Sequence, residues 1–186
     1  MRLFFFYMNI FLPYENNISL SIESLDDRRL NKQILECKQL LSLAVDEKSG
    51  IDISKRGYRN HPIYTHYKSN INFLGYYGYM CCLEYQQRFN KRHSIQDYFM
   101  VYNLKHIINS NGYIPFYAEG SKGQPNYIRT TENVSQLYQR KLVDKWINSK
   151  YNVKWTNRDI PKFFSKYMKE KWINYGTFGG KDGGRK

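Results

Sequence analysis

Residues 24–45 read SLDDRRLNKQILECKQLLSLAV, and this stretch predicts the first long helix of the chain. Ser24 and Asp27 stand three residues apart, as in a capping pair, and Asp27 suits the positive end of a helix. Apolar residues then recur at steps of three and four, at Leu30, Ile34, Cys37 and Leu41. This spacing is that of an amphipathic helix, so the stretch favours a helical fold.

The polar face of the same helix places a carboxylate among basic residues. Lys32 lies one turn before Glu36, Arg29 lies two turns before it, and Arg28 is adjacent. Such a ladder of charges is typical of a solvated helix surface. The functional alternative is an acid/base carboxylate inside a phosphate-binding rim, which requires Glu36 to face a cationic groove rather than the protein interior. The residues alone leave both interpretations open.

Four further helices are predicted downstream, over residues 62–89, 94–110, 134–148 and 161–172. Gly75 and Gly78 lower helix propensity inside the longest of them, so we expect another helix or DNA to approach there closely. The pattern predicts an all-α protein with a single compact domain of four or five helices. We place this domain at residues 8–176. Residues 1–7 would be an N-terminal extension to a buried, extended apolar arm, and residues 177–186 a flexible basic tail.

Composition points to a polyanionic partner. The 186 residues include 29 Lys and Arg against 16 Asp and Glu, a formal charge of +13. This excess favours nucleic acid ahead of an anionic membrane and argues against small-molecule metabolism. No stretch suits a transmembrane helix, so no membrane partner is expected. Aromatic residues, at 17%, can both build a core and stack on bases.

Three cysteines, two of them adjacent, predict neither a disulfide framework nor a zinc site. They favour a reducing intracellular compartment, either cytoplasm or nucleus, and leave a viral origin open. We expect no metal and no cofactor, and a monomer.

Two more motifs each have a structural and a functional interpretation. Residues 57–62, GYRNHP, place Arg59, Asn60 and His61 just before a predicted helix start at Pro62, with Lys68 shortly after. This arrangement predicts a helix cap or, alternatively, a phosphate site. Near the C-terminus, Trp172 and Tyr175 follow several lysines, which indicates either core packing or a platform for stacking bases.

These motifs resemble those of a known family. Residues 25–36, LDDRRLNKQILE, followed by His61 and a long helix ending near Glu84, are similar to the pyrimidine-dimer DNA glycosylases of the phage endonuclease V type. Uncharacterised bacterial relatives of these enzymes are more similar still, because they carry segments like FLPY at 11–14, DDRRL at 26–30 and RNHP at 59–62. The resemblance covers residues 8–90 well and the last 20 weakly.

The resemblance implies an all-α fold without metal, and removal of a damaged base by an amine that forms an imine with deoxyribose C1′. It places the catalytic glutamate on Glu36 and the family histidine on His61. The family arginines fall on Leu35 and Gln39, so Arg28, Arg29 or Arg59 would have to replace them. The nucleophile of the family is an N-terminal threonine amine, which position 2 does not supply.

Three sources of the reacting group therefore remain open. A lysine amine with a lowered pKa suits imine formation, which makes Lys32 a candidate nucleophile. If translation begins at Met8, the amine of Met8 or Asn9 is the counterpart of the family nucleophile. Otherwise Glu36 would activate water.

The sequence thus predicts a DNA repair glycosylase that excises damaged or modified pyrimidines, pyrimidine dimers first, from double-stranded DNA, with or without lyase activity at the abasic site. Glu36, Lys32 and Asn9 are the catalytic candidates. Phosphates would be bound by Arg28, Arg29, Arg59, Asn60, His61 and Lys68, and bases by Trp172 and Tyr175. The alternative is a non-catalytic nucleic-acid-binding protein on the same scaffold, and a weaker one is an enzyme of RNA processing or of modified bases.

Overall fold

The computed structural model describes residues 10–14, 17–68, 70–109 and 134–176, with the side chains of 106–109, 134 and 170–176 outside the description. The predicted first helix is α2, Asp27–Lys48, and its apolar stripe is buried. Its N-cap is Asp26, whose carboxylate accepts hydrogen bonds from the backbone N–H groups of Arg28 and Arg29, both at 3.2 Å. The predicted cap at Ser24 was wrong, because Ser24 instead ends a short preceding helix, α1, Ile18–Glu23.

The stretch predicted as one helix over residues 62–89 forms two. Helix α3, Pro62–Tyr67, begins with the expected proline and is capped by His61, whose Nδ1 accepts the Ile63 N–H at 3.2 Å. Helix α4, Ile71–Phe89, starts after Asn70. Asparagine competes with the backbone for hydrogen bonds and favours helix ends, which accounts for a new start at this point.

Helix α4 is the centre of the domain and packs against α2 and α5, Gln96–Asn109. Its glycines allow α5 to approach. A Cβ atom on Gly78 would lie 2.3 Å from the Phe99 ring, and one on Gly75 would lie 2.6 Å from the Tyr102 ring. The close helix contact predicted from these glycines is therefore confirmed.

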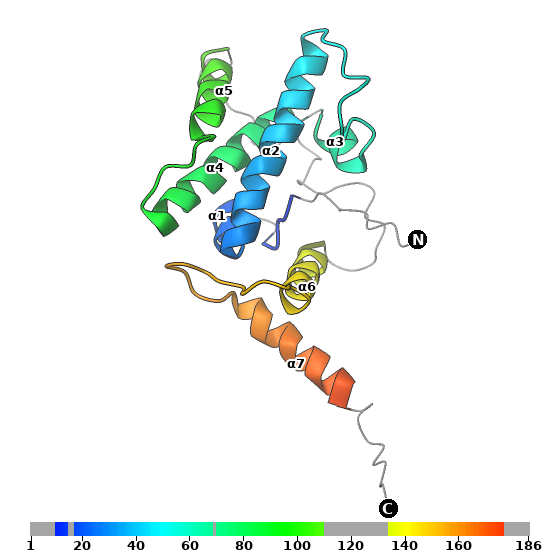
Figure 1. Cartoon of the computed structure of the whole chain (residues 1–186), viewed down its shortest axis with the longest axis vertical. Coiled ribbons are helices and arrows are strands. Elements are labelled where there is room, and N and C mark those ends of the chain that lie inside the picture. The colour runs from blue at the N-terminus through cyan, green and yellow to red at the C-terminus, as the bar shows by residue number, and fades with distance from the viewer. Residues whose placement is uncertain (1–9, 15–16, 69, 110–133, 177–186) are drawn as a thin grey trace, which may run out of the picture.

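Helices α6, Val134–Ile147, and α7, Lys162–Gly176, pack on each other. Figure 1 shows them beyond the N-terminal end of α2, on the side away from α5. Trp146 joins this pair to α2, because its ring stacks on Phe163 at 5.7 Å and its Nε1–H donates to the Asp26 carboxylate at 2.6 Å. Seven helices and no strands make up the described residues, which confirms the all-α prediction; α1 and the division of 62–89 raise the count above five.

The described part of the N-terminal arm lies in the core, as predicted. Ile10, Phe11 and Leu12 are buried and lie outside any helix or strand. The Phe11 N–H donates to Gln33 Oε1 at 2.9 Å, and the Tyr77 hydroxyl donates to the Phe11 carbonyl at 2.8 Å. These contacts place the arm against α2 and α4 at the level of Gln33. Residues 1–9 and 177–186 lie outside the description.

The N-terminus of α2 is also held by a buried guanidinium. Arg88 of α4 is 1% exposed and donates to the Glu84 carboxylate at 2.7 Å and to the Leu25 carbonyl at 2.7 Å. It also contacts Asp27, which accepts hydrogen bonds from Thr156. The first turn of α2 is therefore fixed from two sides.

Two further features concern the cysteines and the helix lengths. All three cysteines are buried and free. None of the described helices has the length and apolar character needed to cross a membrane.

Candidate functional site

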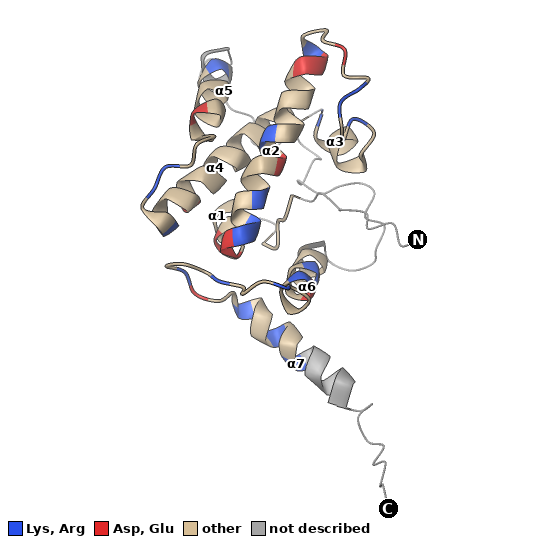
Figure 2. Ribbon diagram, viewed as in Figure 1, with Lys and Arg blue, Asp and Glu red and all other residues tan. Residues whose placement is uncertain are grey.

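A cleft of about 510 Å³ separates the N-terminal half of α2 from the end of α6 and the turn that follows it. Its volume lies in the range of ligand sites. Five basic and two acidic side chains line it, together with polar and aromatic groups: Phe11, Arg28, Arg29, Lys32, Gln33, Glu36, Asp144, Lys145, Asn148, Ser149, Lys150 and Tyr151. Figure 2 shows basic residues in the N-terminal half of α2 and along α6. The cleft is thus predominantly cationic.

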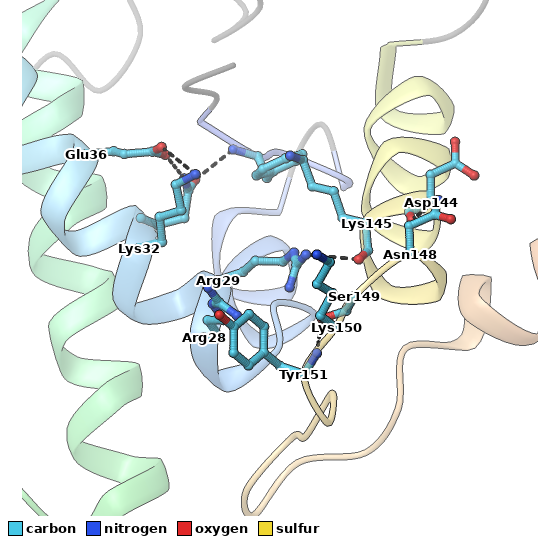
Figure 3. A pocket seen from close by; sticks show the side chains of 12 residues that line it. Arg28, Arg29, Lys32, Glu36, Asp144, Lys145, Asn148, Ser149, Lys150 and Tyr151 are labelled. Carbon is cyan, nitrogen blue, oxygen red and sulfur yellow. Dashed lines mark hydrogen bonds and ion pairs between the residues drawn. The ribbon is translucent and has the colours of Figure 1, made fainter. Parts of the chain in front are cut away.

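Glu36 forms part of the α2 wall of this cleft (Figure 3). Only 6% of the residue is exposed, yet its carboxylate does not pack into the apolar interior. Gln33 Nε2 donates to Oε2 at 2.8 Å, and Lys32 Nζ lies 3.5 Å from Oε1. Because Gln33 Oε1 accepts the Phe11 N–H, the amide of Gln33 has one favourable orientation, with its NH₂ group toward Glu36. The carboxylate is therefore held at a defined position.

Arg29 connects the two walls of the cleft. Its guanidinium forms an ion pair with Asp26 at 3.2 Å and donates to the Lys145 carbonyl at 3.1 Å. The Arg29 side chain is only 16% exposed. Together with the bond from Trp146 to Asp26, this contact fixes the end of α6 opposite α2. Arg29 lines the predicted site, and most of its donors are already engaged by the protein.

Lys145 extends its side chain from α6 into the cleft, over the ring of Phe11, with Nζ 6.0 Å from the ring centroid (Figure 3). Burial lowers the pKa of the Lys145 amine, the positive charges of Lys32 and Arg29 lower it further, and Glu36 opposes them by raising it. Lys145 is thus half-buried within the electrostatic influence of Glu36, although it lies 109 positions away in the sequence.

The opening of the cleft carries a stacked pair. The Arg28 guanidinium lies over the Tyr151 ring, 3.6 Å from its centroid, and Tyr151 is 61% exposed. Both residues line the cleft. A guanidinium on an exposed ring offers one flat face and several N–H donors, which suits a base, a sugar or a phosphate.

The second predicted motif lies apart from this cleft. Arg59, Asn60 and Lys68 are exposed but do not line it. His61 caps α3, as the structural interpretation predicted, and burial lowers the pKa of its imidazole. The roles of these residues in DNA binding stay predictions, for a surface separate from the cleft.

The two positions that correspond to family arginines also lie elsewhere. Leu35 and Gln39 line a second hollow, of about 410 Å³, that includes Arg56 and Tyr58. Neither lines the cleft around Glu36. The basic residues of that cleft therefore come from other positions on α2 and from α6.

Three predicted site residues cannot be placed. Asn9 lies outside the described residues, and Trp172 and Tyr175 lie on the part of α7 whose side chains are not described. The aromatic residue upstream, Trp155, packs on Trp146 with ring centroids 4.9 Å apart and is a partly buried residue at the edge of the core. Within the described ranges, no cluster of three or more His, Cys, Asp or Glu side chains is arranged to hold a metal ion.

Sequence reasoning missed the entire α6 wall of the cleft. Lys145 and Tyr151 carry no motif of their own, although a polar, basic and aromatic turn after a predicted helix end is a weak signal of a binding surface. Helical spacing places Gln33 on the polar face of α2, yet it is 1% exposed, because the N-terminal arm covers it.

The protein is therefore an all-α protein with a cationic cleft that holds a carboxylate. Such a cleft suits a polyanionic substrate. Residues 8–97 match the family described as pyrimidine dimer DNA glycosylase. This segment is therefore similar to that family, which confirms the resemblance of its motifs. Comparison with curated proteins and with solved structures found no match.

Proposed function

We propose that this protein excises damaged or modified pyrimidines from duplex DNA, with pyrimidine dimers as the preferred lesion and Glu36 as the acid/base group. The observation that carries the proposal is the position of the Glu36 carboxylate, held by Gln33 and Lys32 at the wall of a cleft with five basic side chains. A phosphodiester backbone is attracted by such a cleft, and a sugar held there meets the carboxylate.

The chemistry requires that the target nucleotide leave the duplex. The cleft lies between two helices, and a sugar inside a stacked duplex does not reach a side chain that is 6% exposed. The substrate must therefore be bent or the nucleotide flipped out. The stacked pair of Arg28 and Tyr151 at the cleft opening is suited to contact the distorted strand.

Two routes break the bond between C1′ and the base. In the first, a neutral amine attacks C1′, the base leaves with the bonding electrons, and opening of the sugar ring gives an imine. In the second, Glu36 removes a proton from water and the resulting oxygen nucleophile adds to C1′ while the base leaves with the bonding electrons and takes a proton. Only the first route gives a covalent adduct that borohydride reduces, and it permits strand cleavage at the abasic site. Lys32 and an N-terminal amine at Asn9 are the amines that the sequence suggests.

The test uses the full chain with a duplex carrying defined lesions. The protein is incubated with three substrates: a duplex with an ultraviolet-irradiated thymine pair, a duplex with oxidised pyrimidines, and undamaged DNA. Cleavage at abasic sites is then measured with and without borohydride. We expect release from the irradiated duplex above the undamaged control. Salt-sensitive binding that ignores damage, with no release from any lesion over long incubation, would instead identify a non-catalytic DNA-binding protein.

A further inference from the structure

Imine formation sets two requirements on the side chains of this cleft. The attacking amine must be neutral near physiological pH, and it must reach the same sugar as the acid/base carboxylate. A lysine meets the first condition when burial or neighbouring cations disfavour its charged form. Both conditions concern the arrangement of side chains rather than their order in the sequence.

Lys32, the lysine suggested by the sequence, is engaged with the carboxylate itself. Its Nζ lies 3.5 Å from Glu36 Oε1. Its side chain is 49% exposed, so water stabilises its charge. These features suit a cation that holds Glu36 better than a neutral nucleophile.

Lys145 occupies the opposite wall. Its side chain is half-buried over the Phe11 ring, and among the described residues no carboxylate forms an ion pair with its amine. The bonds from Arg29 to the Lys145 carbonyl and from Trp146 to Asp26 hold this part of α6 across from α2. A nucleotide in the cleft would therefore lie between the Lys145 amine and the Glu36 carboxylate.

The charged and titratable groups around Lys145 come from three elements. From α2 they are Arg28, Arg29, Lys32 and Glu36; from α6, Lys141 and Asp144; and from the turn after α6, Lys150 and Tyr151. Cations outnumber carboxylates in this set. The environment thus disfavours a further positive charge at this position, in agreement with the lowered pKa of Lys145.

From this geometry we propose that Lys145 is the nucleophile that forms the imine, a role that rests on the glycosylase function proposed above. Its neutral amine attacks C1′ as the bond from C1′ to the base breaks, and the base takes the bonding electrons and a proton. The amine nitrogen then releases one proton. Its lone pair forms the C1′=N bond while the C1′–O4′ bond breaks, and O4′ takes a proton. Water later adds to C1′ and releases the lysine, or elimination of the 3′ phosphate follows.

The first part of the experiment tests whether Lys145 forms the imine, independently of whether the protein releases a base. Wild-type protein is incubated with a duplex that already contains one abasic site, and cyanoborohydride reduces any imine. Digestion and mass spectrometry then locate the sugar adduct. We expect the adduct on Lys145, its loss in Lys145→Arg, and its retention in Lys141→Arg. Lys141 is a matched control, because it is another half-buried lysine of α6 whose pKa is lowered by burial, and it does not line the cleft.

The second arm follows the rate of trapping against pH. Because the neutral amine reacts, the rate rises with pH and levels off above the pKa of Lys145. Lys32→Met removes a cation that lowers this pKa, so its profile moves to higher pH. Glu36→Gln removes the carboxylate that raises it, so its profile moves to lower pH. A lysine that only binds phosphate would show neither shift.

The outcomes separate the two proposals. An adduct on Lys32, on an N-terminal residue or spread over many lysines would overturn the role of Lys145, as would base release without any adduct. None of these results affects the glycosylase function. If Lys145 forms an adduct at a preformed abasic site but the protein releases no base from any lesion, Lys145 is supported as the nucleophile and the glycosylase function is rejected. Circular dichroism melting of each variant shows that it is folded.

Discussion

Gln33 Nε2 donates a hydrogen bond of 2.8 Å to Glu36 Oε2, while the other end of the same amide accepts the Phe11 N–H at 2.9 Å. One buried side chain thus joins the N-terminal arm to the candidate acid/base group. The arm takes part in the site without contributing a reactive side chain of its own among the described residues.

Gln33→Leu should weaken activity through the position of Glu36. The substitution removes the donor to the carboxylate and leaves the Phe11 N–H without its partner, which costs about 1–3 kcal/mol of stability. We expect kcat for base release to fall with little change in KM. Urea unfolding measures the stability loss. A variant with wild-type kcat would show that Glu36 needs no such support.

Glu36→Gln should reduce base release by a factor of roughly 10² to 10⁴, the usual contribution of an acid/base group. Duplex binding should persist, because the substitution preserves shape and removes a negative charge from a cationic cleft. Asp159→Asn is the charge-matched control, since Asp159 is exposed and does not line the cleft. Equal activity of the two variants would remove Glu36 from the mechanism.

Tyr151→Ala should weaken binding to damaged duplex, because it removes the ring on which the Arg28 guanidinium stacks. Stacking of a base on such a ring contributes about 1–3 kcal/mol, a factor of roughly 5 to 150 in Kd. Tyr151→Phe keeps the ring and should bind like the wild type. Fluorescence anisotropy measures both. If Tyr151→Ala also binds normally, the pair is a surface contact without a role in DNA binding.

Gly78→Ala should destabilise the domain by about 1–3 kcal/mol, because the added Cβ would lie 2.3 Å from the Phe99 ring at the crossing of α4 and α5. Gly57→Ala is the control, since nothing lies within 4 Å of a Cβ there. Thermal and urea unfolding measure the difference. Equal stability of the two variants would show that α5 can move away from α4 at no cost.

Much of the fold could be predicted from local patterns. The apolar stripe of α2, Pro62 at the start of α3 and the close approach at Gly78 all follow from spacing or from the properties of one residue. The cap of α2 could not be predicted securely, because Ser24 and Asp26 both suit that position. Their roles are decided by tertiary contacts, since Asp26 also accepts a hydrogen bond from Trp146.

The site was predictable only on one side. Glu36, Lys32, Arg28 and Arg29 lie on one helix, where a period of 3.6 residues brings them together. Lys145 joins them through hydrogen bonds between residues more than a hundred positions apart, for which local sequence gives no signal. His61 is the opposite case. Its position in the sequence is explained by its local role as the N-cap of α3, so no ligand is needed to account for it.

The hydrogen bond between Trp146 and Asp26 has a consequence during biosynthesis. A nascent polypeptide leaves the ribosome with α2 long before α6, and protein domains acquire structure as their parts emerge. The early segment carries Glu36 and the basic residues of α2 but lacks the α6 wall, so it does not yet form a cleft. The cleft would thus be complete only after translation has passed Trp146.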